Sequence, residues 1–252
     1  LTVGAQAGLG TYGELWITGD EELTGWTNLS AGAAADDTVV TVDDGTGFAE
    51  GDEILILSQQ GTDAGTHEFA FVAEAVGNDL TIEPPLSNAY DAASQVLVQW
   101  VPHLTDVRVE AGGTLSNAGW DGAGGGVLVF RATGDVLIEG TVDLGAAGFL
   151  GGDGVYGNDY DPYQGESHGG IGAQGVTTAN DGGGGAYPRR GDHGDSGGGG
   201  GYGTDGDWGY EYGGSAVCEG GLAYGAADLA DWFVGAAGGG GRAGLYFGLW
   251  GL

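Results

Sequence analysis

Between residues 36 and 110, apolar and polar positions alternate in short runs separated by turn-forming residues. Such runs predict β-strands, because successive side chains of a strand point to opposite faces. Gly77 and Asn78 lie between two of the runs, as the tight turn of a hairpin requires. We interpret as strands residues 38–42, 53–58, 67–75, 80–83, 95–101 and 105–110. So many short strands favour a small β-barrel or β-sandwich over a helical fold.

A second pattern repeats a strand, a glycine and another short strand. Residues 106–115 (DVRVEAGGTL) are similar to residues 135–144 (DVLIEGTVDL), and residues 127–132 form a further predicted strand between them. Copies at a fixed spacing are typical of successive rungs of a parallel β-solenoid. After Gly145 the pattern gives way to glycine, aspartate and tyrosine. One option there is a set of extended helices with three residues per turn, which glycine allows to pack closely side by side.

These patterns predict an all-β protein in three parts. We expect an extended N-terminal arm over residues 1–35, a small β-barrel or sandwich module over residues 36–111, and a glycine-rich region over residues 112–252 with an apolar C-terminal tail. The glycine-rich region is expected to be a β-solenoid or a polyglycine-type stacked structure. A mobile low-complexity spacer is the alternative, but the many aromatic residues of this region argue for order, since such side chains build cores.

Composition and charge limit which classes of molecule the protein can bind and which disulfides it can form. The chain has 252 residues, of which 60 are glycine, with a formal net charge of −31 from 36 acidic and five basic residues. So acidic a surface repels polyanions, which excludes nucleic acid as a partner. The single cysteine, Cys218, excludes an internal disulfide, and a buried small residue is favoured over a bridge between chains.

The location is predicted from the same composition. No apolar run approaches the ~20 residues of a membrane helix, so we expect no membrane span. The chain begins at Leu1 and contains no methionine. We therefore expect a processed, secreted product that is extracellular or on the cell surface.

Several segments resemble a known group of proteins. Residues 41–44 (TVDD), 47–48 (GF), 51–53 (GDE), 78–82 (NDLTI) and 85–86 (PL) resemble a small β module of bacterial surface proteins. Residues 112–115 (GGTL), 120–122 (WDG), 126–130 (GVLVF), 224–225 (YG) and 227–229 (ADL), before the glycines at 238–241, are similar to glycine-rich secreted proteins of environmental bacteria. The resemblance spans residues 38–244. It implies export and an all-β, glycine-rich architecture, and this largely uncharacterised family implies no catalytic residue.

Acidic residues and one asparagine are candidate sites. Asp159 and Asp161, and likewise Asp205 and Asp207, are spaced so that they could offer several oxygens to Ca²⁺, which is the one cofactor we consider. The sequence favours the alternative, in which these aspartates are solvated and keep the surface soluble. Asn28 begins an Asn-Leu-Ser acceptor for an N-linked glycan.

Apolar residues near both ends form a candidate assembly interface. An end that completes the sheet of a neighbouring copy makes a head-to-tail contact, which propagates into a fibre when the rotation does not close a ring. The alternative, that both ends fold back onto their own domain, remains open. The residues concerned are Leu1, Val3, Leu15, Trp16 and Ile17 at the start, and Leu245, Tyr246, Phe247, Leu249, Trp250 and Leu252 at the end.

We therefore expect a non-enzymatic structural subunit of an extracellular filament, sheath or matrix. It would assemble as a head-to-tail homopolymer through its apolar termini and through glycine and aromatic packing. Two alternatives stay open: a cell-surface adhesin or glycan-binding protein whose rings stack on sugars, and a polysaccharide-active β-solenoid enzyme with paired carboxylates. No sequence motif assigns a catalytic or cofactor-binding residue.

Overall fold

The computed structural model describes residues 9–153, 155–156, 161–186, 196–201, 204–210, 215–224, 238–239 and 242–243. These residues form β-strands and loops, with one short 3₁₀ turn (η1, Ala92–Ser94) and no α-helix among them. The all-β prediction is confirmed for this part of the chain. The chain divides into unit 1 (Leu1–Ser58 and Thr66–Ala147) and unit 2 (Gln59–Gly65 and Gly148–Leu252). The predicted boundaries after residues 35 and 111 both fall inside unit 1.

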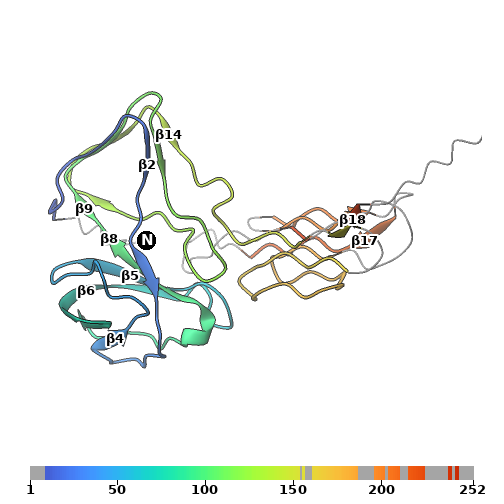
Figure 1. The fold of residues 1–252 in the computed structure, drawn as a ribbon, viewed down its shortest axis with the longest axis horizontal. Helices are drawn as coiled ribbons and strands as arrows, with labels where there is room; N and C mark the ends of the chain where they lie inside the picture. Colours follow the sequence, from blue (N-terminus) through green and yellow to red (C-terminus); the bar gives the residue numbers. More distant parts are fainter. Residues whose placement is uncertain are drawn as a thin grey trace, which may run out of the picture. The chain divides into compact units, whose positions relative to one another are not determined.

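Unit 1 contains an antiparallel sheet with the strand order β3-β8-β5-β6-β7-β4. Its strands β4, β5, β6 and β8 are labelled in Figure 1. Five of the predicted runs coincide with its strands, and Gly77, with φ of +61°, joins β6 to β7 in the predicted hairpin. The edge strand β3 lies before the predicted module and pairs with β8. The strands are β3 (Trp26–Asn28), β4 (Val39–Thr41), β5 (Glu53–Ser58), β6 (His67–Val76), β7 (Asp79–Glu83) and β8 (Val96–Val101).

The main core of unit 1 lies against one face of this sheet. Alternate residues of the strands point into it, as the two-residue period of a strand requires. Both faces of β5 are buried, which explains why its run of Ile and Leu is continuous. The core residues contributed by the strands are Val40, Ile54, Ile56, Ala70, Val72, Leu80, Ile82, Val96 and Val98.

Unit 1 also contains two ladders of short parallel strands. The strands β1 (Leu15–Ile17), β10 (Val107–Val109) and β13 (Val136–Ile138) are in the order β1-β10-β13, and β2 (Asp20–Glu22), β11 (Thr114–Ser116) and β14 (Thr141–Val142) in the order β14-β11-β2. Val107 pairs with Val136, so the repeat seen between residues 106–115 and 135–144 is a parallel pairing of strands. Strands β1 and β2 supply a third copy. The solenoid predicted for residues 112–252 stays a prediction.

A small core and close-packed corners support the two ladders. Ile17, Val109 and Leu115 are buried together. A Cβ at Gly113 would lie 2.8 Å from the carbonyl oxygen of Ile17, so only glycine fits the corner between β10 and β11. Beside the ladders, β9 (His103–Leu104) pairs in parallel with β12 (Arg131–Ala132).

Unit 2 is held by backbone hydrogen bonds between short glycine-rich segments. The N–H groups of Gly198 and Gly201 donate to the carbonyls of Gly185 (2.9 Å) and Gly182 (2.7 Å), whereas that of Gly199 donates to Asp207 (2.7 Å). Gly198 and Gly201, three residues apart, thus bond to the same neighbouring segment, residues 182–185. Three residues is the period of an extended helix with three residues per turn. Residues 196–201 belong to no strand.

Gly221 shows why this packing needs glycine. Its N–H donates to Gly199 (2.9 Å) and its carbonyl accepts from Gly206 (2.8 Å). A Cβ here would overlap the carbonyl oxygen of Gly182 and lie 2.9 Å from the nitrogen of Gly201. Its φ lies outside the left-handed region, so the requirement is the close approach of other backbone segments. These contacts match the side-by-side packing raised as an option from the sequence.

Among the described residues of unit 2, four short strands form two pairs. β15 (Val155–Tyr156) pairs in parallel with β18 (Arg242–Ala243), and β16 (Gly209–Tyr210) pairs antiparallel with β17 (Ala216–Cys218). Cys218 is buried, in line with its interpretation as a small core residue.

Candidate ligand-binding site

A pocket of about 420 Å³ opens in unit 1 between four aromatic side chains and one carboxylate. We call it the ring pocket. Its volume lies within the roughly 300–1,000 Å³ range of small-molecule sites in proteins. The lining residues are Tyr12, Thr24, Gly25, Trp26, Thr46, Gly47, Phe48, Ala49, Asp52 and Trp100.

The sheet and the segment before it position the rings. Trp100 lies in β8, and its N–H donates to the carbonyl of Gly25 (2.8 Å). The ring of Tyr12 stands at 90° to that of Trp100, with centroids 4.8 Å apart, in the edge-to-face arrangement that aromatic pairs prefer. Trp26 lies in the edge strand β3, and a Cβ at Gly124 would lie 2.6 Å from its ring. These three rings are therefore held by packing and backbone contacts.

Asp52 fixes the orientation of Tyr12. The carboxylate is 5% exposed, its Oδ2 accepts the N–H of Ala49 at 2.8 Å, and its Oδ1 accepts the hydroxyl of Tyr12. Burial raises the pKa of Tyr12, and the hydrogen bond to Asp52 raises it further, so the hydroxyl remains a donor. Both oxygens of Asp52 are thus used in positioning.

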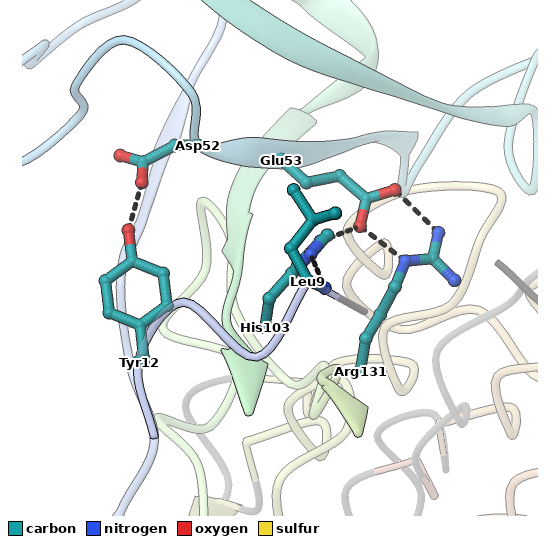
Figure 2. A network of polar contacts seen from close by, with 6 residues as sticks. All are labelled: Leu9, Tyr12, Asp52, Glu53, His103 and Arg131. Atoms are coloured by element: carbon teal, nitrogen blue, oxygen red, sulfur yellow. Dashed lines mark hydrogen bonds and ion pairs between the residues drawn. The ribbon is translucent and has the colours of Figure 1, made fainter. Parts of the chain in front are cut away.

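The next residue, Glu53, is the centre of a buried polar network behind the pocket (Figure 2). Figure 2 shows Asp52 pointing to Tyr12 and Glu53 pointing to His103 and Arg131, as expected for consecutive residues entering a strand. Arg131 donates through Nη2 to Oε1 of Glu53 (2.6 Å) and through Nε to Oε2. Glu53 is 2% exposed, and its hydrogen bonds raise the pKa of Arg131.

His103 links this network to the segment that carries Tyr12. The N–H of Leu9 donates to Nδ1 of His103 at 2.8 Å, so Nδ1 is unprotonated. Nε2 therefore carries the proton and donates to Glu53 at 2.7 Å. The N–H of Tyr12 also donates to the carbonyl of His103 (2.9 Å). These bonds fix residues 9–12 against β9 before any ligand arrives, and His103 is in turn bound to Glu53 of β5.

The arrangement is suited to binding. None of the residues that line the ring pocket is a histidine, serine, cysteine, lysine or arginine. The rings offer apolar faces, and Thr24, Thr46 and Tyr12 offer hydroxyl groups. The sequence did not single out this pocket, because its rings come from separate segments that only the β3–β8 pairing and the fixed segment at residues 9–12 bring together.

The predicted metal ligands are not gathered in the part of the chain that the structure describes. No group of three or more His, Cys, Asp or Glu residues that could hold a metal is found there. Oδ1 of Asp205 accepts the N–H of Ala223 (2.7 Å), and the carbonyl oxygens of Asp161 and Asp207 accept hydrogen bonds within unit 2. Asp159 lies outside the described residues, and Ca²⁺ binding stays a prediction.

The predicted assembly residues of the N-terminal segment lie in β1. Leu15, Trp16 and Ile17 pair with β10 of the same chain, and Ile17 is buried there. This is the fold-back arrangement that the sequence left open. Trp16 is 61% exposed, and its Nε1 donates to Glu110 (3.1 Å). Outside the described residues lie Leu1, Val3, Leu245, Tyr246, Phe247, Leu249, Trp250 and Leu252.

Asn28, the predicted glycan acceptor, lies in β3 and is half-buried. The amide nitrogen that would carry a glycan donates to the carbonyl of Ala123 at 3.0 Å. Attachment of a sugar there would replace a hydrogen bond of the fold.

No protein-family model and no curated protein matches this chain. Three solved structures resemble part of it: the tailspike gp49 of Pseudomonas phage LKA1 (16% identity, TM-score 0.28), the tailspike gp54 of Acinetobacter baumannii bacteriophage AP22 in complex with capsular saccharide (13%, 0.29), and the tailspike gp61 of Pseudomonas phage phi297 (20%, 0.30). They cover 39%, 48% and 54% of this chain. The chain matches 21%, 21% and 23% of theirs, less than a quarter in each case. In the described residues, no helix is long and apolar enough to span a bilayer.

Proposed function

We propose that this protein is an extracellular, non-enzymatic glycan-binding protein, and that the ring pocket is its sugar site. The observation that carries this proposal is the convergence of Tyr12, Trp26, Phe48 and Trp100 on one pocket of about 420 Å³. Sugars have apolar C–H faces and a rim of hydroxyl groups. Tyr and Trp match both, since each has a large apolar body and one polar group.

The support behind the pocket favours binding. The buried network of Glu53, His103 and Arg131 fixes the segment that carries Tyr12, and Asp52 fixes the tyrosine hydroxyl. A site that is already ordered loses little conformational entropy when it binds, and more of the contact energy then appears as affinity.

Binding of the whole protein to an array of immobilised glycans tests the proposal. Tyr12→Ala should weaken binding at least tenfold, because Tyr12 is a half-exposed wall of the pocket. Trp16→Ala removes a more exposed ring that does not line the pocket, and it should bind as the wild type does. Circular dichroism checks that both variants fold. Wild-type protein that binds no glycan refutes the function, and equal binding by Tyr12→Ala refutes the site.

One observation favours a second candidate, the self-assembling subunit of a filament, sheath or matrix. Val136 and Ile138 occupy the places in β13 that buried Val107 and Val109 occupy in β10, yet they are 50% and 40% exposed. In the described residues β13 has only β10 as a neighbour, and β1 likewise pairs on one side only. A second copy that sets its β1 beside β13 would continue the ladder in the same register.

Sedimentation and electron microscopy test this candidate. Salt should promote assembly, because a net charge of −31 opposes contact between copies until it is screened. Ile138→Asp should prevent it. Wild-type protein that remains monomeric at every salt concentration would exclude the candidate.

A further inference from the structure

We infer that the ring pocket takes the cationic amine of an amino sugar, so that the protein prefers glycans with free amino groups over neutral and acidic ones. The inference rests on the proposed function and names the substrate class of the same site. It follows from the charge, the burial and the ring geometry of the pocket.

Asp52 is a buried carboxylate without a counterion in the part of the chain that the structure describes. Its hydrogen-bond partners are the hydroxyl of Tyr12 and the N–H of Ala49, and both are neutral. The carboxylates that form ion pairs there are Glu53 and Glu110. Arg131 donates two hydrogen bonds to Glu53, whose side chain points toward His103 and Arg131, whereas that of Asp52 points toward Tyr12 (Figure 2). A bound cation would therefore be the first positive charge beside Asp52.

The rings favour the same ligand. The face of an aromatic ring carries negative electrostatic potential, and cations bind over Trp and Tyr in particular. Tyr12 and Trp100 stand at right angles, so they form two adjoining walls of the pocket near Asp52. The chain as a whole, with a net charge of −31, raises the local concentration of cations and repels anions.

Other sugar classes fit the pocket less well. A uronic or sialic acid would bring a second carboxylate beside Asp52, with no basic side chain in the lining to offset it. A neutral N-acetyl group would bring no positive charge to act as a counterion for the Asp52 carboxylate. We expect at least tenfold tighter binding of the free amine than of its acetylated form.

Calorimetry with matched ligands tests the inference. Short glucosamine oligomers, their N-acetylated forms and galacturonate oligomers are titrated into the whole protein at about pH 5.5, where the amine is protonated. The expected order is glucosamine first and galacturonate last, and the preference should shrink at about 0.5 M salt, where the Debye length falls to a few ångströms.

Two variants separate the pocket from general attraction to an acidic protein. Ala49 is exposed and lines the pocket, so Ala49→Arg places a cation there, with Ala49→Gln as its neutral control. Ala49→Arg should lower glucosamine affinity at least tenfold relative to Ala49→Gln. Tyr12→Ala keeps the net charge and removes one wall of the pocket. Glucosamine binding that is as tight in this variant as in the wild type is diffuse attraction and overturns the inference.

Failure of the amino-sugar inference can be distinguished from failure of the glycan-binding proposal. Equal or tighter binding of the N-acetylated oligomer overturns the inference and leaves the glycan-binding proposal standing. If none of the three oligomers binds and the glycan array also shows no ligand, both are refuted.

Discussion

Replacement of Gly221 by alanine tests whether main-chain contacts hold unit 2 together. The added methyl would overlap the carbonyl of Gly182 and press on the nitrogen of Gly201. The backbone would have to move, which strains the hydrogen bonds that Gly221 makes with Gly199 and Gly206. Overpacking costs about 1–3 kcal/mol, and each lost hydrogen bond costs about 1 kcal/mol. We therefore expect a destabilisation of unit 2 of about 3–5 kcal/mol.

Amide hydrogen exchange on the whole protein measures this effect. A loss of about 3–5 kcal/mol should speed exchange in residues 182–186, 196–201 and 219–222 by roughly 10²- to 4 × 10³-fold, since each 1.4 kcal/mol is a factor of ten. Residues 53–58 and 96–101 of unit 1 serve as the internal reference.

Gly151 provides the matched control. The nearest atom to a Cβ at Gly151 is the carbonyl oxygen of Gly238 at 3.7 Å, an ordinary contact, and its φ is not left-handed. Gly151→Ala should change stability by no more than about 0.5 kcal/mol, or raise it slightly by restricting the unfolded chain. Exchange in unit 2 that is the same in wild type and Gly221→Ala would refute the packing argument.

Two further predictions concern buried charge and pH. Arg131→Met should destabilise unit 1 by about 3 kcal/mol, because it leaves the charge of buried Glu53 uncompensated. Arg108→Met breaks a more exposed ion pair and should cost under about 1 kcal/mol. Urea denaturation measures both losses, and equal losses would contradict this reasoning. Burial lowers the pKa of His168 below its usual 6.5, an effect that Asp181 partly opposes. The unfolded chain then binds more protons, so unit 2 should be most stable above about pH 6.5 and lose stability below it. His168→Phe should flatten this dependence in denaturation curves at two pH values, and an unchanged slope would contradict the assignment.

The sequence predicted most of the antiparallel sheet because five of its strands lie in longer runs of strand-forming residues, which alternate in part in β6 and are continuously apolar in the centre of β5. Residues 53–58, for example, coincide with β5. Strands β1, β2 and β3 were missed, because each has only three residues and its partner is far away in the chain, as with Leu15 and Val107. A run of three residues carries too little pattern to show which strand it joins.

Neither the ring pocket nor the pairing of segments in unit 2 could be predicted from the sequence, and the reasons differ. The rings of Tyr12, Trp26 and Trp100 come from the segment at residues 9–12 and from strands β3 and β8, and only the folded sheet gathers them. In unit 2 the sequence allowed packed polyglycine but could not pair the segments, because glycine has no side chain whose period would reveal a neighbour. The contact between Gly221 and Gly182 depends on main-chain geometry alone.

Packing through glycine backbones has a consequence for how unit 2 can diversify. Since many contacts between its segments are made by main-chain atoms, the exposed positions between the essential glycines carry little of the fold's stability. Ile171, Trp208 and Leu222 all project into solvent from this frame. Mutation can change the side chains exposed at such positions while the backbone hydrogen bonds between the glycine-rich segments remain the same.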